Sequence, residues 1–160
     1  MVDETDMVHL RRCVDLAEEA LTKGDEPFGS VLVADDGRVL FEDHNHVGSG
    51  DHTRHPEIEA ARWAAANMTP AERGRATVYT SGEHCPMCAA AHGWVGLGPI
   101  VYASSSEQLV TWLDELGVGL PPVQALPVTA VVPDASVDGP VPQLAPDVRA
   151  LHERLHRTGN

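Results

Sequence analysis

The chain has 160 residues, 42% of them hydrophobic, with 24 acidic residues against 11 Lys and Arg and a formal net charge of −13. This length predicts one domain whose core needs no disulfides, and no run approaches the roughly 18 apolar residues of a membrane span. The acidic start lacks the apolar segment of a signal peptide and the scattered basic residues form no stripe, so we expect a cytoplasmic protein that acts on a small molecule and not on a nucleic-acid polymer.

The first part of the chain predicts a helix followed by a hairpin. Apolar residues recur at spacings of three and four along residues 4–22, which is typical of an amphipathic helix. Two short apolar runs follow, at residues 28–33 and 39–41. Asp36-Gly37 lies between them and predicts an antiparallel hairpin with a type I′ turn, because both central positions of that turn need positive φ.

The middle of the chain alternates helices and strands. After a polar loop over residues 43–55, the pattern predicts in order a helix at 56–67, a strand at 76–80, a helix at 86–95, a strand at 100–103 and a helix at 107–116. Alternation of this kind after a hairpin predicts an α/β fold, in which helices cover both faces of a central mixed sheet of about five strands.

The tail differs in composition, because seven of the twelve prolines lie in the last 40 residues. We predict an edge strand at residues 128–132, an extended linker at 133–146 and a short helix at 147–156. The chain is therefore divided into a domain over residues 1–132 and a Pro-rich tail over residues 133–160. The tail could form a lid over the site or contact a neighbouring subunit.

Two motifs carry the chemistry: His55-Pro56-Glu57 and Cys85-Pro86-Met87-Cys88, each at the start of a predicted helix. Thiolate and imidazole are ligands that zinc prefers, and three protein ligands leave a fourth position for water, as in catalytic zinc sites. His55, Cys85 and Cys88 are thus candidate ligands of Zn²⁺. Glu57 follows the histidine by two residues and could carry protons to and from the activated water.

Together with residues 26–31 and Asn45, these motifs resemble the zinc-dependent cytidine deaminase superfamily, most closely its branch of guanine, nucleobase and tRNA adenosine deaminases. The resemblance covers roughly residues 10–116. It implies a three-layer cytidine deaminase-like fold, zinc on the histidine and two cysteines of the motifs, and Glu57 as the proton carrier. Residues 1–132 would then form a zinc-dependent deaminase domain.

The resemblance also indicates where substrate could be contacted. It implies that Asn45 hydrogen-bonds the substrate and that Phe28 lines the base pocket. His84 stands where the superfamily usually has proline and could alter the pocket. Trp112 could stack on a base or pack in the core, and the two acids that follow could contact substrate or belong to a solvated helix end. The candidate substrate contacts are therefore Asn45, Phe28, His84, Trp112, Asp114 and Glu115.

The activity implied is hydrolytic deamination of a free nucleobase or related amino-heterocycle, such as a guanine-like or modified purine, cytosine or an aminotriazine, by a homodimer. Deamination of a nucleoside or of tRNA adenosine is the alternative. Two readings without deamination stay open: a zinc-stabilised binding module in which His84 or His92 closes the coordination, and a thioredoxin-like redox pair, which leaves His55 and Glu57 unexplained.

Other side chains that could bind ligands have plainer interpretations. We expect His44, His46 and His52 to be solvated loop histidines. Trp63 and Trp94 lie in Ala-rich predicted helices, and we expect core or subunit contacts for them.

Overall fold

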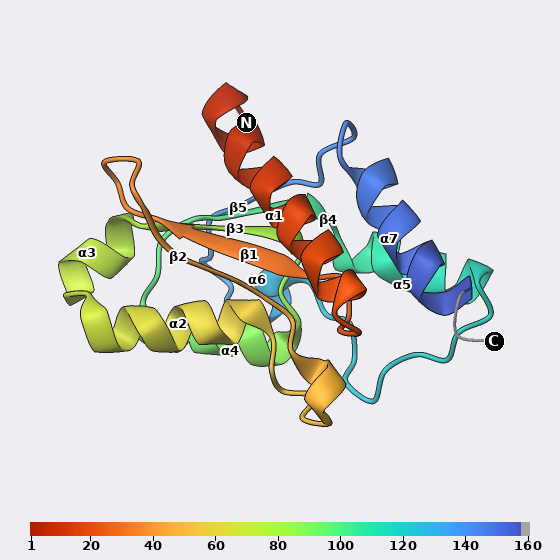
Figure 1. Cartoon of the computed structure of the whole chain (residues 1–160). Coiled ribbons are helices and arrows are strands. Elements are labelled where there is room, and N and C mark those ends of the chain that lie inside the picture. Colours follow the sequence, from red (N-terminus) through yellow and green to blue (C-terminus); the bar gives the residue numbers. More distant parts are fainter. Residues whose placement is uncertain (158–160) are drawn as a thin grey trace.

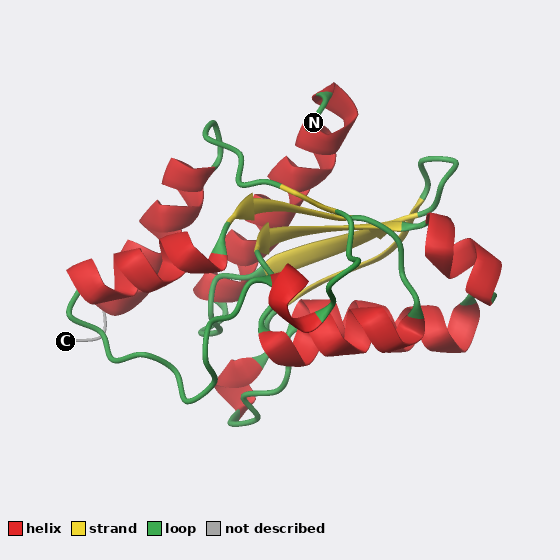
Figure 2. Cartoon of the chain, turned by 180° about the vertical axis from the view of Figure 1, so that it is seen from behind, coloured by secondary structure: helices red, strands yellow, loops and turns green. Residues whose placement is uncertain are grey.

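The computed structural model describes residues 1–157 of the chain, and its centre is a mixed five-stranded sheet (Figure 2). The strand order is β2-β1-β3-β4-β5. The pairs β1–β2 and β1–β3 are antiparallel, whereas β3–β4 and β4–β5 are parallel. The strands are β1 (Gly29–Val33), β2 (Val39–His44), β3 (Thr77–Gly82), β4 (Ile100–Ser104) and β5 (Val137–Asp138).

Helices cover both faces of the sheet, which gives three layers (Figure 1). One face carries α1 (Glu4–Thr22), α5 (Ser106–Glu115) and α7 (Ala145–Arg157). The other carries α2 (Pro56–Asn67), α4 (Pro86–Val95) and α6 (Val128–Val131). The predicted α/β architecture is confirmed. No helix within residues 1–157 is long and apolar enough to cross a membrane.

The core has apolar clusters on both faces of the sheet, because successive side chains along a strand point to opposite faces and both faces are covered by helices. On β1, Val31 and Val33 pack with Leu10 of α1, whereas Leu32 between them packs on the opposite face with Ala64 of α2. All five residues of β1 are buried. A further apolar cluster lies between β4 and the helices α4 and α6, and includes Ile100.

The helix starts are set by residues that suit a first turn. Pro56 begins α2 and Pro86 begins α4, where proline loses no hydrogen bond because the first N–H groups of a helix have no partner in it. His55 and Cys85 are consequently the N-cap residues of these two helices. The two motifs therefore stand at the starts of two helices on one face of the sheet.

The hairpin forms as predicted, but its turn is different. Gly37 has a φ of +90°, while no residue other than glycine has positive φ within residues 1–157, so Asp36 cannot take part in a type I′ turn. The Gly37 N–H donates to the Ala34 carbonyl (2.9 Å) and the Ala34 N–H to the Arg38 carbonyl (2.9 Å). A longer turn with glycine in the left-handed region thus closes the hairpin.

The predicted secondary structure of the tail is wrong at two places. Residues 128–131 form helix α6 and not an edge strand, because one helical turn buries Val128 completely against α4 and β4. The edge strand is β5, inside the segment predicted as an extended linker. The final helix begins earlier than predicted, at Ala145, and helix α3 (Pro70–Arg75) was not predicted.

Candidate active site

The two motifs meet at the starts of α2 and α4, which lie side by side (Figure 1). Nδ1 of His55 lies 3.5 Å from Sγ of Cys85 and 3.6 Å from Sγ of Cys88. Cys88 is buried, whereas His55 and Cys85 are half-buried. The predicted convergence of these three side chains is thus seen in the fold.

The distances test whether zinc would fit. Zinc bonds of about 2.3 Å to sulfur and about 2.0–2.1 Å to nitrogen, at tetrahedral angles, place an imidazole nitrogen about 3.5–3.6 Å from a thiolate sulfur. His55 Nδ1 lies at 3.5 and 3.6 Å from the two sulfurs. The geometry of this donor set therefore fits a tetrahedral zinc ion.

The electrostatics of the cluster favour a thiolate at Cys85. A hydrogen bond from the Cys88 thiol is the largest cause that lowers the pKa of Cys85 to about 4; burial opposes it, and a hydrogen bond from His55 adds to it. The hydrogen bond to Cys85 in turn raises the pKa of His55 to about 9. Since metals bind thiolate and neutral imidazole, a metal would displace both the proton of the Cys88 thiol and the second ring proton of His55.

Glu57 lies in the first turn of α2 and is buried, with 5% of its surface exposed. The Thr80 hydroxyl of β3 donates to its Oε1 (2.9 Å). Burial raises the pKa of Glu57, and the positive charge of His55 opposes this. Thr80 could not be predicted from the sequence, since only the approach of α2 to β3 brings it to the carboxylate.

Asn45 is almost fully buried, and its side chain holds the loop after β2. Its Oδ1 accepts from the N–H of Val47 (2.9 Å) and of Glu26 (3.3 Å). No hydrogen bond engages its Nδ2 within residues 1–157, so this donor stays available. The Asn45 N–H donates to the Phe28 carbonyl (3.0 Å), which places the two predicted substrate contacts next to each other.

Phe28 and Trp112 both lie near His152 of α7. The centroids of the Phe28 and His152 rings are 5.1 Å apart, and the rings meet edge to face. The Phe28 ring also packs closely on Gly82, because a Cβ added at this glycine would lie 3.4 Å from the Phe28 ring. The Trp112 ring lies 6.2 Å from that of His152 and is buried in the core beneath α1.

His84 is buried beside His92, with ring centroids 5.4 Å apart, and neither of its ring nitrogens has a hydrogen-bond partner among the described residues. His92 uses Nε2 on the Gly98 carbonyl (2.8 Å). Neither histidine belongs to the group of donor atoms formed by His55 and the two cysteines. The geometry gives no support to a closed site with either as fourth ligand.

The structure does not bring the two acids of α5 to this cluster. Asp114 and Glu115 are exposed, and Glu115 pairs with Arg149 of α7 (2.7 Å). A missed acid is Glu83, whose carboxylate accepts from the N–H groups of Ser106 (3.0 Å) and Val128 (2.8 Å). Glu83 thereby ties the starts of α5 and α6 to the segment that leads to Cys85.

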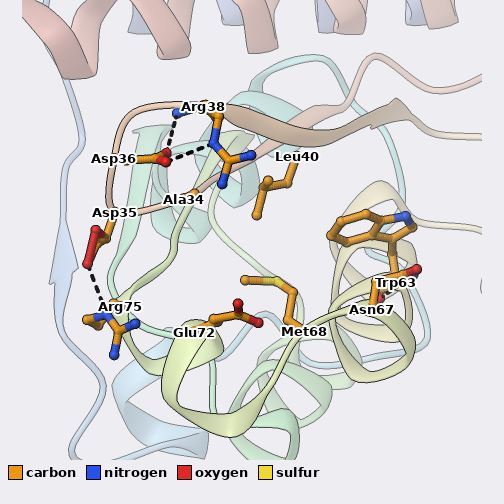
Figure 3. Close-up of a pocket in the computed structure, with 10 residues that line it drawn as sticks. All are labelled: Ala34, Asp35, Asp36, Arg38, Leu40, Trp63, Asn67, Met68, Glu72 and Arg75. Atoms are coloured by element: carbon orange, nitrogen blue, oxygen red, sulfur yellow. Dashed lines mark hydrogen bonds and ion pairs between the residues drawn. The ribbon is translucent and has the colours of Figure 1, made fainter.

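A cavity of about 330 Å³ lies elsewhere, between the β1–β2 hairpin and helices α2 and α3 (Figure 3). Leu40, Trp63 and Met68 form its apolar wall. Ion pairs of Arg38 with Asp36 and of Arg75 with Asp35 lie at its rim. None of the motif residues lines this cavity, so we place the candidate active site at the motifs, where metal-binding donors meet a buried acid.

The sequence is similar to those of known deaminases. Residues 3–104 match the model of a protein family that is described as "Cytidine and deoxycytidylate deaminase zinc-binding region". The chain is 30% identical over 116 residues to a probable cytosine deaminase of Schizosaccharomyces pombe, covering 72% of this chain and 70% of the relative. It is 38% identical over 97 residues to a guanine deaminase of Bacillus subtilis, covering 59% of this chain and 62% of the relative.

The fold is also similar to solved structures. One is a guanine deaminase from Nitrosomonas europaea, with a TM-score of 0.73 and 18% identity, covering 98% of this chain and 86% of that one. At this level of identity the similarity shows the shared fold.

Proposed function

The chain belongs to the family of cytidine and deoxycytidylate deaminases, and we propose that it hydrolyses the exocyclic C–N bond of a free nucleobase or related amino-heterocycle and releases ammonia. The observation that carries this proposal is the meeting of His55, Cys85 and Cys88 at zinc-compatible distances. Buried Glu57 lies in the first turn of α2, the helix that begins directly after His55.

We propose that these three side chains hold Zn²⁺, the cofactor named in the family description. When bound, the ion supplies activation of water near neutral pH. Glu57 then accepts a proton from the attacking water and passes it to the ring nitrogen beside the carbon under attack. A second transfer through Glu57 protonates the amine, so that the water oxygen remains as the carbonyl of the product and ammonia leaves.

A free base is the proposed substrate class for two reasons. The two relatives described above are named as a probable cytosine deaminase and a guanine deaminase, and both names refer to free bases. The net charge of −13 and the absence of a basic stripe disfavour a tRNA substrate. Asn45 Nδ2 is the proposed donor to the base and Phe28 the proposed wall of its pocket.

The experiment is an ammonia-release screen with zinc-loaded protein over guanine, adenine, cytosine, their oxidised forms, the matching nucleosides and aminotriazines. For the best substrate, Glu57→Gln should lower turnover about 10²–10⁴-fold with unchanged zinc content. Glu59→Gln, two residues further along α2, is the matched control and should leave turnover unchanged. A nucleoside preference would favour the alternative substrate class. Zinc binding without ammonia release from any compound would favour a binding module.

We also propose that the protein is a homodimer whose contact includes Trp94. This side chain on α4 is 91% exposed, so it does not pack in the core of one chain and is free to make the subunit contact that we expect for it. Sedimentation equilibrium should show a dimer that Trp94→Arg weakens. A monomer at micromolar concentration would contradict the proposal.

A further inference from the structure

A second group of metal-binding side chains lies outside the candidate active site, where the turn after α1 meets the end of β2. One donor atom each from Asp25, His44 and His46 lie within 4.8 Å of one another. His44 is the last residue of β2 and only 6% exposed, so the prediction of a solvated loop histidine is wrong for it. Asp25 and His46 are half-buried, which leaves the group reachable from solvent.

Each imidazole uses one ring nitrogen as a donor. His44 Nδ1 lies 2.7 Å from the Asn45 carbonyl, and His46 Nε2 lies 2.7 Å from Oδ1 of Asp43. Carbonyl and carboxylate oxygens only accept, so these nitrogens carry the protons. The lone pairs of neutral rings are then on His44 Nε2 and His46 Nδ1. Histidines that bind metals commonly donate their other N–H to such oxygens.

The ammonium group of Lys23 already donates a hydrogen bond to one of these lone pairs. Nζ of Lys23 lies 3.2 Å from His44 Nε2. An ammonium group can only donate, so His44 Nε2 is the acceptor. This contact independently supports the assignment of the His44 lone pair and shows that it faces a position suited to positive charge.

The carboxylate of Asp25 is held beside the two histidines by a backbone hydrogen bond. Its Oδ1 accepts from the Gly48 N–H (2.8 Å). A Cβ at Gly48 would lie 2.7 Å from this oxygen, so the approach depends on glycine. Its second oxygen is left as a ligand.

We propose that Asp25, His44 Nε2 and His46 Nδ1 bind a divalent transition-metal ion of the Zn²⁺ or Ni²⁺ type, which displaces the Lys23 ammonium. Two imidazoles with one carboxylate favour such ions over Mg²⁺ and Ca²⁺, which prefer oxygen ligands. Bonds of about 2.0–2.2 Å need donor atoms about 3 Å apart, so the three side chains, which lie within 4.8 Å of one another by one ligand atom each, would move closer together when the ion binds. The ion would link the turn after α1 to the loop that begins at Asn45.

The test is a calorimetric titration of untagged protein, already carrying one equivalent of zinc, with Ni²⁺. We expect one further equivalent to bind with a Kd in the micromolar range, and elemental analysis should show that the first zinc stays bound. His46→Gln and Asp25→Asn should each weaken binding at least about tenfold. Asp25→Asn keeps an oxygen for the Gly48 N–H and removes only the charge.

Two further variants serve as a control and as a test of the role of Lys23. His52→Gln, an exposed histidine of the same loop, is the control and should bind Ni²⁺ like the wild type. Lys23→Met should tighten binding, because no ammonium has to leave. The proposal is overturned if the wild type binds no second equivalent, if binding survives both ligand variants, or if only Lys23→Met binds. None of these outcomes depends on whether the protein deaminates a base.

Discussion

At the scale of single residues, the orientation of the Glu57 carboxylate depends on a short chain of hydroxyl groups. The Ser30 hydroxyl of β1 donates to Thr80 Oγ1 (3.0 Å), and the Thr80 hydroxyl donates to Glu57 (2.9 Å). All three side chains are buried. A buried carboxylate held by a donor on a central strand has one orientation, which suits a group that has to accept and return a proton.

Thr80→Val should therefore reduce turnover while the shape of the side chain is kept. Loss of one hydrogen bond worth about 0.5–1.5 kcal/mol predicts that kcat falls about 2–13-fold with little change in KM. Thr80→Ser should restore kcat. Thr77→Val, on the same strand, is the control. An unchanged kcat for Thr80→Val would show that Glu57 does not need this contact.

The sequence predicts the motif residues better than their supports. His55 and Cys85 could be placed together because proline marks the start of both helices. Thr80 could not be found, because its partner is 23 positions away and meets it only when α2 packs on the sheet. His44 was misjudged because its burial comes from the turn around Lys23 and Asp25, which local polarity does not reveal.

At the scale of elements, α1 lies unusually close to β1 at Gly29. A Cβ at this glycine would lie 2.4 Å from the Cys13 carbonyl oxygen and 2.5 Å from Cβ of Leu16. Gly29→Ala would push the helix off the strand, and overpacking of this kind costs about 1–3 kcal/mol. Urea unfolding should therefore show that the free energy of unfolding of Gly29→Ala is about 1–3 kcal/mol lower than that of the wild type.

Gly74 provides the matched control for this substitution. It lies within α3 and an added Cβ would meet nothing within 4 Å. Gly74→Ala should leave stability unchanged or raise it by up to about 1 kcal/mol. Equal effects of the two substitutions would contradict the close packing of α1 on β1.

The attachment of α7 should depend on pH through His152. Burial lowers the pKa of His152 from 6.5 to about 4, and His156 adds to the effect. As pH falls below 6.5, the unfolded chain takes up this proton before the folded chain does, so stability is lost until about pH 4. The loss between pH 7 and pH 5 is about 2 kcal/mol.

His152→Phe removes the titration and keeps an aromatic ring against Phe28 and Trp112. Urea unfolding from pH 7 to pH 5 should show a smaller loss of stability for this variant than for the wild type. Parallel pH profiles would mean that His152 does not resist protonation in the folded protein.

Elements with local end signals were predicted well, whereas those fixed by tertiary contacts were not. Helix α4 runs from Pro86 to Val95 as predicted, since proline starts it and Gly96, with a φ of +78°, ends it. Residues 128–131 are rich in valine, which favours a strand. Packing of Val128 against α4 overrides that preference.

At the scale of the whole molecule, the tail contributes to the main core. Val141, Leu144 and Val148 pack in the same apolar cluster as Leu10 of α1. Full burial of one such side chain stabilises a fold by about 1.5–3 kcal/mol, and the net stability of a domain is about 5–15 kcal/mol. We expect a chain that ends at residue 132 to lose cooperative unfolding in urea.

The same truncation tests the proposed roles of residues 133–160 as lid or subunit contact. A truncated chain that folds cooperatively with the wild-type kcat and KM would show that the tail is dispensable for both folding and closure. A folded chain with altered KM would support a lid, and one that becomes monomeric would support a subunit contact.

The central claim is a zinc site with two sulfur donors, one imidazole and one open position. Zinc K-edge X-ray absorption of the protein with one equivalent of zinc measures this sphere directly. We predict two sulfurs at about 2.3 Å, one imidazole nitrogen at about 2.0–2.1 Å and one further light atom. Two imidazoles, a third sulfur or the absence of bound zinc would contradict the claim.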